Sequence, residues 1–218
     1  LIAGQGIAVH LGDGPASERI VIDPVGMFVV LGERGAALAG GARGAAMLIL
    51  REALDDARDY AANRAAFDRN QRRDYALSRL DLEALVPVVE GRLPLVVAVD
   101  RASDILAALR LREEMSLHLI LMGAAEGWMV ADDIAAADVP VVVFPLQNIP
   151  SFERLGATLE NAARMHAAGV SVAIGTGGFD PHDSRNLKHA AGVASVTLLI
   201  ISGIQLAIDA IRQLRAIV

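Results

Sequence analysis

The chain has 218 residues, of which 54% are hydrophobic and only 4% aromatic, and its formal net charge is −6. Its core must be built from Ala, Val, Leu and Ile, which is typical of a parallel sheet covered by helices. The negative charge argues against nucleic-acid binding, which needs a basic face. The lack of cysteine excludes disulfides and thiolate metal sites and leaves the localisation open, so any metal would need His and carboxylate ligands.

The N-terminal part of the chain predicts strands separated by turns. Residues 1–11 are apolar with two glycines and indicate a strand end or a tight loop, residues 12–17 a turn, and residues 25–31 a strand. Residues 32–44 are rich in glycine but match neither GxGxxG nor GxxxxGK[ST], so a mobile loop is favoured over a nucleotide site. The first residue is Leu1, and no cationic signal-peptide start follows it, which indicates a fragment or a product cut upstream.

Two helices are expected next. Residues 45–69 show apolar side chains at helical spacing and form the longest predicted helix. A basic cluster at its end, which includes Arg72 and Arg73, is interleaved with acidic residues and indicates a solvated face. The second predicted helix spans residues 78–89, with Asp81 as its N-terminal cap and Glu83 in the first turn.

Four apolar runs, each followed by a helix-like segment, organise the rest of the chain. The runs span residues 95–99, 118–122, 140–144 and 171–174. Strands that are apolar throughout are buried on both faces, and helical connections between them require a parallel arrangement. The sequence therefore predicts an α/β fold in which these runs are adjacent parallel strands in chain order.

The helices expected after these runs span residues 104–115 with Ser103 as cap, 128–137, 152–168 before Gly169, and from Asp183 or Ser184 to about residue 201. A closing helix is expected over residues 206–217. Residues 190–208 carry no charge and are long enough to span a bilayer, but polar residues interrupt them and residues 202–203 indicate a break. Two core helices are therefore favoured over a membrane span.

Polar and glycine-rich residues cluster where each predicted strand ends, at residues 100–104, 123–127, 147–151 and 176–186. Ligands bind at this edge of parallel α/β sheets. The sequence therefore predicts the functional site there. It contains no GxSxG, which makes a nucleophile elbow an unfavoured alternative.

Several blocks of the chain now resemble a known family. In order they read AVDRASDI (98–105), GAAEGW (123–128), PLQNIPSFERLGA (145–157) and LENAARMHAAGV (159–170). They resemble the amidohydrolase superfamily, with most likeness to its imidazolonepropionase- and prolidase-like branch. The likeness covers most of residues 80–186.

The resemblance implies a (β/α)8 barrel of the TIM type, of which this chain would supply about the last five strand–helix units as one partial barrel domain over residues 1–218. It also implies metal-assisted hydrolysis of amide C–N bonds in small molecules or dipeptides, with a divalent metal such as zinc at the C-terminal strand ends. The family's His-x-His pair occurs nowhere in the chain. Ala98, and Gly123 or Ala124, stand where the family places His ligands.

The resemblance assigns roles to a small set of residues near the strand ends. Asp180, in GTGGFDPH, would hold the metal and take a proton from the attacking water; its alternative role is to cap the helix that begins near residue 183. His182 would be a second metal ligand or a substrate contact. Arg185 and Asn186 would bind a substrate carboxylate, although Arg185 could instead pair only with Asp183.

Other polar residues carry weaker assignments. Glu126 would contact substrate at the pocket edge, beside Trp128, a residue type that more often packs than binds. A salt-bridged loop is favoured over catalysis for Asp100, Arg101 and Asp104. The helical His166 is interpreted as structural, together with His118 and His189.

Three interpretations remain. The chain is part of an amidohydrolase-like enzyme, a degenerate relative that serves as a binding or scaffold subunit without metal, or an unrelated flavodoxin-like domain, which explains the ordered blocks least well. The expected partners are a small-molecule or dipeptide substrate and another chain or subunit that completes the barrel. Neither nucleic acid nor membrane is expected as a partner.

Overall fold

A computed structural model describes residues 1–10, 12–176 and 183–195 of the chain. The chain divides into two compact units. Unit 1 contains Leu1–Val99 and Leu106–Leu121, and unit 2 contains Asp100–Ile105 and Met122–Val218. The predicted helix over residues 206–217, and the predicted helical residues 196–201, lie outside the described residues.

Six strands form one mostly parallel sheet, in the order in which they follow one another along the chain. They are β1 (Ile2–Val9), β2 (Ile20–Val30), β3 (Leu95–Val99), β4 (Leu119–Gly123), β5 (Val141–Val143) and β6 (Val172–Ile174). Pairing is antiparallel between β1 and β2 and parallel between β2 and β3 and between β5 and β6. The predicted neighbour order of the four apolar runs is confirmed, as is an α/β fold with a mostly parallel sheet. A barrel of the TIM type stays a prediction.

Strand β3 is buried on both faces, as its unbroken apolar run predicts. Four of its five residues are buried and Ala98 is half-buried. The backbone N–H of Leu95 donates to the carbonyl of His118 at 2.8 Å, next to the start of β4. Such strands need cover on both faces, because their side chains alternate between the two sides of the sheet.

The first residues form a full strand rather than the predicted strand end or loop. Strand β1 alternates between half-buried and exposed residues, and it pairs with β2, which begins at Ile20 rather than at residue 25. Its backbone hydrogen bonds to β2 favour the extended conformation even though neither face of β1 is fully buried.

Part of the glycine-rich stretch is helical, which corrects the prediction of a loop. Helix α1 (Gly32–Ala37) follows β2 directly. A Cβ at Gly35 would lie 2.4 Å from the carbonyl oxygen of Val30, so only glycine permits this close turn from strand into helix. Gly40 and Gly41 then adopt positive φ angles in the turn that leads to the next helix.

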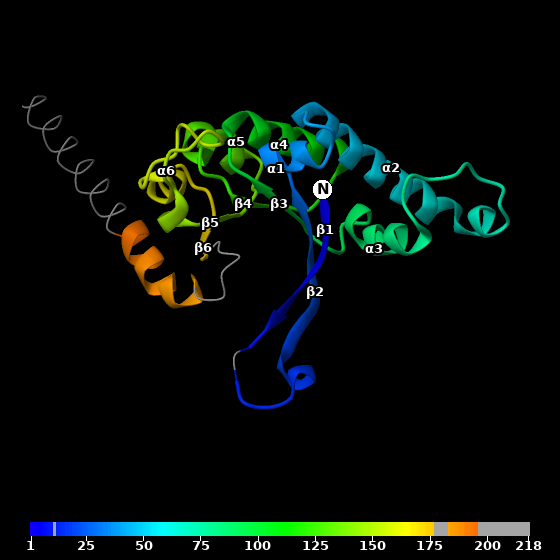
Figure 1. Ribbon diagram of the computed structural model, residues 1–218, viewed down its shortest axis with the longest axis horizontal. Coiled ribbons are helices and arrows are strands. Elements are labelled where there is room, and N and C mark those ends of the chain that lie inside the picture. The colour runs from blue at the N-terminus through cyan, green and yellow to red at the C-terminus, as the bar shows by residue number, and fades with distance from the viewer. Residues whose placement is uncertain (11, 177–182, 196–218) are drawn as a thin grey trace, which may run out of the picture. The chain divides into compact units, whose positions relative to one another are not determined.

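The long predicted helix is confirmed as α2 (Arg43–Asp68), and α3 (Arg79–Val89) packs against it (Figure 1). Leu50 and Leu54 of α2 are fully buried, as is Leu82 of α3. The cap of α3 is Ser78, not Asp81: its Oγ accepts a hydrogen bond from the Asp81 backbone N–H at 3.3 Å. Asp81 instead occupies the first turn, where its negative charge interacts favourably with the positive end of the helix dipole.

The connection between α2 and α3 is held by two carboxylates on α2. Asp56, which is fully buried, pairs with Arg73 and accepts from the Ala76 N–H at 3.2 Å. Asp59 pairs with Arg72, and the hydrogen bond from Arg72 lowers the pKa of Asp59. The basic cluster that was predicted to be a solvated face is thus partly ion-paired. Arg72 and Arg73 reach the two carboxylates because the chain after α2 folds back along this helix.

The later helices begin at different residues from those predicted. Helix α4 (Ala102–Met115) already includes Ser103. The segment predicted over residues 128–137 is the 3-10 turn η2 (Gly127–Val130) followed by α5 (Ala131–Ala136). Helix α6 (Asn161–Ala167) is much shorter than predicted, because residues 152–160 form turns fixed by side chains of neighbouring loops.

The C-terminal part of the described chain agrees with the prediction only in outline. Gly169 follows α6 with a φ of +91°, as a helix-ending glycine should. The 3-10 turn η4 (Asp183–Asn186) leads into helical residues 187–195. None of the helices among the described residues has the length and apolarity that crossing a membrane would require.

Candidate functional site

The loops at the C-terminal strand ends of unit 2 are tied together by one buried carboxylate. The side chain of Glu126, which follows β4, is only 7% exposed. One carboxylate oxygen accepts from the Ala102 N–H at 3.0 Å and the other from the Gly156 N–H at 2.9 Å. Glu126 also donates its own N–H to the Asp100 carbonyl at 2.9 Å. It therefore joins the start of α4 to the loop after β5.

Asp100 lies beside Glu126 and pairs with an arginine from the loop after β5. Its Oδ1 accepts from the Ala125 N–H at 3.2 Å, and its Oδ2 lies 3.5 Å from Nη1 of Arg154. Burial raises the pKa of Asp100, an effect that Arg154 and the Ala125 N–H oppose and that Glu126 adds to. The predicted ion pairing of this loop thus exists, although Asp100 pairs with Arg154 rather than Arg101. Arg101 donates to the Phe152 carbonyl at 2.8 Å.

Asn161 and Trp128 add further hydrogen bonds between the residues after β4 and the segment that follows β5. Asn161 is 1% exposed; its carboxamide accepts from the Trp128 N–H at 2.9 Å and donates to the Ala124 carbonyl at 2.9 Å. The indole N–H of Trp128 donates to the Gly156 carbonyl at 2.8 Å. The guanidinium of Arg164 lies 4.5 Å from the centroid of the indole ring. Trp128 is therefore part of the packing that holds the loop.

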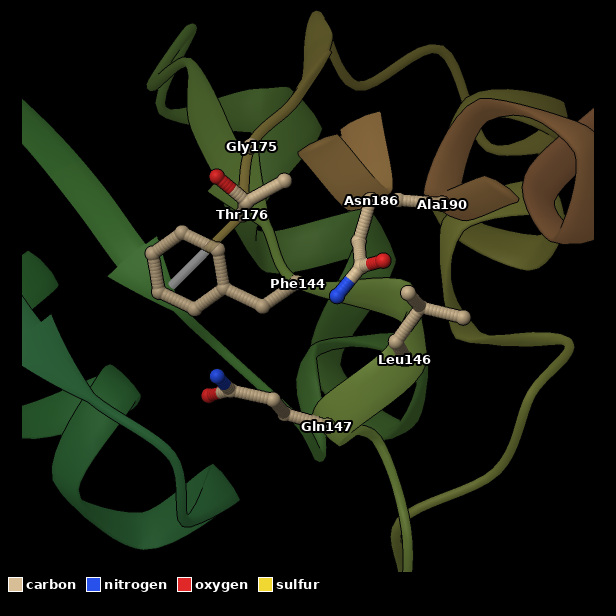
Figure 2. Close-up of a pocket in the computed structure, with 7 residues that line it drawn as sticks. All are labelled: Phe144, Leu146, Gln147, Gly175, Thr176, Asn186 and Ala190. Atoms are coloured by element: carbon tan, nitrogen blue, oxygen red, sulfur yellow. The ribbon is translucent and has the colours of Figure 1, made fainter. Parts of the chain in front are cut away.

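A small pocket opens where β5 and β6 end (Figure 2). Its volume is about 200 Å3. The described residues that line it are Phe144, Leu146, Gln147, Gly175, Thr176, Asn186 and Ala190. None of these seven carries a formal charge, so the polar groups that they offer are two carboxamides and one hydroxyl.

The predicted site residues are distributed unevenly around this pocket. Asn186 lines it, and the exposed Arg185 precedes Asn186 on η4. Glu126 is not among the lining residues, and both of its oxygens already accept backbone hydrogen bonds; a substrate contact for it stays a prediction. Asp180 and His182 lie outside the described residues.

The described side chains alone do not fit a catalytic metal. No three His, Asp or Glu residues come together in the part of the chain that the structure describes. Ala98 and Gly123 stand on β3 and β4 at positions where a ligand was expected, and neither has a donor side chain. A catalytic zinc uses three protein ligands and leaves one position open. Further donors would have to come from residues outside the described ranges, such as Asp180 and His182, or from another polypeptide.

Sequence reasoning missed several residues that build this edge. Neither the spacing of residues nor the family resemblance assigned a role to Arg154, Asn161, Phe144, Gln147 or Thr176. The pairing of Asn161 with Ala124 and Trp128 spans distant segments, so only the folded chain reveals it.

Comparison with known proteins supports the fold. No family model matches the chain, and no curated protein matches it. A crystal structure of an amidohydrolase from Thermotoga maritima MSB8 is similar, with a TM-score of 0.74 and 24% identity. The match covers 90% of this chain and 52% of that chain, so this chain spans about half of its length. At this identity the likeness establishes a shared fold: an α/β arrangement of the kind found in that amidohydrolase.

Replacing Glu126 by Gln is expected to destabilise unit 2 by about 1–3 kcal/mol, because a buried amide N–H2 would then face a backbone N–H. The measurement is urea unfolding followed by the fluorescence of Trp128, the only tryptophan in the sequence. The matched change Glu113→Gln on the exposed side of α4 should leave stability within about 0.5 kcal/mol. Equal effects of the two substitutions would contradict an anchoring role for Glu126.

Asp100 is expected to make stability depend on pH. Because its pKa is raised above 3.8 in the folded chain, its protonated form favours folding below 3.8, and that contribution is lost as the pH rises through the folded value. The native chain should therefore lose stability relative to Asp100→Asn when the pH goes from below 3.8 to neutral. Urea midpoints of both proteins at the two pH values test this. A native chain that gains on the variant over this interval would refute it.

Proposed function

We propose that this chain is part of an amidohydrolase-like hydrolase that cleaves amide C–N bonds in small molecules or dipeptides with the help of a metal. The observation that carries the proposal is the shared fold over nine tenths of the chain, taken with the sequence blocks that resemble the family. Three of those blocks lie where β3, β4 and β5 end, and the fourth spans α6. The finer likeness to the imidazolonepropionase- and prolidase-like branch belongs to the same proposal.

A divalent metal such as zinc would polarise the scissile carbonyl and lower the pKa of a bound water. Asp180 and His182 are the proposed ligands of this chain, with Asp180 also the proposed proton acceptor, and Arg185 and Asn186 are proposed to bind the substrate. The donors among the described residues do not fit such a site, and Ala98 and Gly123 occupy two of the expected ligand positions. Active hydrolysis is therefore proposed only for an assembly in which another polypeptide adds ligands.

The lack of donor side chains at Ala98 and Gly123 also favours a second candidate function. A degenerate relative would keep the fold, lose the metal chemistry and act as a binding or scaffold subunit. The network around Glu126 needs no metal, since both carboxylate oxygens are satisfied by backbone N–H groups. The metal content of the chain together with its partner polypeptide separates the two candidates.

The chain by itself is predicted to hold no stoichiometric metal and to show no amide hydrolysis, because two candidate ligands bind a divalent ion weakly. The test is elemental analysis after dialysis, together with an assay against N-acyl amino acids and dipeptides. One tightly held zinc per chain, lost with activity in Asp180→Ala but kept in the exposed control Asp132→Ala, would overturn the degenerate candidate and establish the enzyme.

A partner chain is the further prediction. Within the described residues the sheet ends at β1 on one side and β6 on the other, and outer strands present unpaired N–H and C=O groups. In the Thermotoga maritima amidohydrolase, the part that this chain does not match is about as long as the part that it does match. We expect light scattering to find the chain in a complex with another subunit or another copy. A clean monomer across a wide concentration range would count against the proposal.

A further inference from the structure

The loop after β5 exposes its apolar side chains and half-buries its charged ones. Ile149, Phe152 and Leu155 are 61%, 75% and 69% exposed, whereas Glu153 and Arg154 are half-buried. The usual arrangement is the reverse, because a charged group loses hydration when it is buried. The centres of protein interfaces are poor in charged residues and rich in aromatic residues and Met. The loop therefore has the composition of an interaction surface rather than that of a solvated loop.

Met129, which follows β4, continues the same apolar surface. It is 53% exposed, and its sulfur lies 2.9 Å from the place that a Cβ would take at Gly156, the residue after Leu155. Side chains from the ends of two consecutive strands thus form one apolar area. We call its four exposed residues, all of unit 2, the loop surface: Met129, Ile149, Phe152 and Leu155.

Hydrogen bonds hold the loop surface in one shape. The backbones of Ser151 and Arg154 bond to each other twice, at 3.0 and 3.3 Å, which closes a tight turn with Phe152 near its tip. The side chain of Arg101 donates to the Phe152 carbonyl at 2.8 Å. A surface that is ordered before it binds loses less conformational entropy on binding. The exposed Phe152 is thus presented by a backbone that is already fixed.

Opposite charges stand at the two ends of the loop surface. At one end, the guanidinium of Arg101 lies 6.0 Å from the centroid of the Phe152 ring, and its bond to the carbonyl leaves other N–H donors for a further acceptor. At the other end, the exposed Asp132 and Asp133 come soon after Met129, in the first turn of α5. In a two-fold interface, each residue meets its reciprocal partner on the other copy. Two copies can therefore place Arg101 of each beside the acidic residues of the other.

We propose that the loop surface binds a second copy of this chain, in a two-fold dimer in which the Phe152 side chains pack near the axis. Charge selects this occupant, because a surface with opposite charges at its ends and apolar groups between them complements itself. The repulsion between two chains of net charge −6 is screened beyond about 8 Å at physiological salt. The proposal goes beyond the proposed hydrolase, and it concerns loops of unit 2 rather than the outer strands of the sheet.

The first measurement is sedimentation equilibrium of the 218-residue chain in physiological salt, which should show a dimer at micromolar concentration. Phe152→Asp and Leu155→Asp each put a charge into the interface twice. Each should weaken dimerisation about a hundredfold, about tenfold for each copy. The matched control is Leu48→Asp on α2 of unit 1, since Leu48 is 66% exposed and thus similar to Leu155; it should leave the dimer unchanged. Urea unfolding followed by Trp128 fluorescence checks that every variant is folded.

The lack of cysteine in the chain permits an independent measurement. A short bismaleimide should join Phe152→Cys into covalent dimers, because a residue near a two-fold axis faces its own counterpart. Leu48→Cys is the control and should remain a monomer on a denaturing gel. A dimer that Phe152→Asp or Leu155→Asp leaves intact, or equal cross-linking of the two cysteine variants, would overturn the proposal. A chain that sediments as a monomer at every concentration would also overturn it and would point to a different polypeptide or a ligand as the occupant.

Discussion

The C-terminal edge of unit 2 depends on the burial of one carboxylate. Glu126 accepts from the backbone N–H groups of Ala102 and Gly156, two residues that belong to different loops. A charge so little exposed is tolerated only when hydrogen bonds replace its lost hydration. Satisfying it requires the start of α4 and the loop after β5 to stand at fixed positions. Trp128, Asn161 and the Asp100–Arg154 pair are then placed around the same loop.

This fixed loop leads back to the candidate pocket. Phe144, Leu146 and Gln147 are its first residues after β5, and each of them lines the pocket. Side chains of a binding site work best when a second layer of hydrogen bonds holds their backbone in place. Glu126 holds Gly156 of the same loop, and Asn148, which follows Gln147, donates its side-chain N–H to the Thr158 carbonyl. Charged groups thus organise the loop, whereas the described residues that line the cavity carry no formal charge.

The fold and the available side chains carry separate information about function. The likeness to the Thermotoga maritima amidohydrolase concerns the arrangement of strands and helices, and a fold by itself does not fix an activity. Activity resides in particular side chains, and Ala98 and Gly123 contribute none at two strand ends. An architecture can persist without its metal ligands because sheet and helices are stabilised by apolar burial, to which those ligands contribute little.

The sequence by itself determined the elements whose residues all follow one pattern. The apolar runs that became β3 to β6 and the amphipathic helix α2 could be read directly, because burial on a regular element leaves a periodic trace. Tertiary structure decided whatever depended on distant partners. Residues 152–160 are turns rather than helix because Glu126, Arg101 and Trp128 bind their backbone. The neutral pocket was likewise hidden, since its lining joins residues more than forty positions apart in sequence, from Phe144 to Ala190.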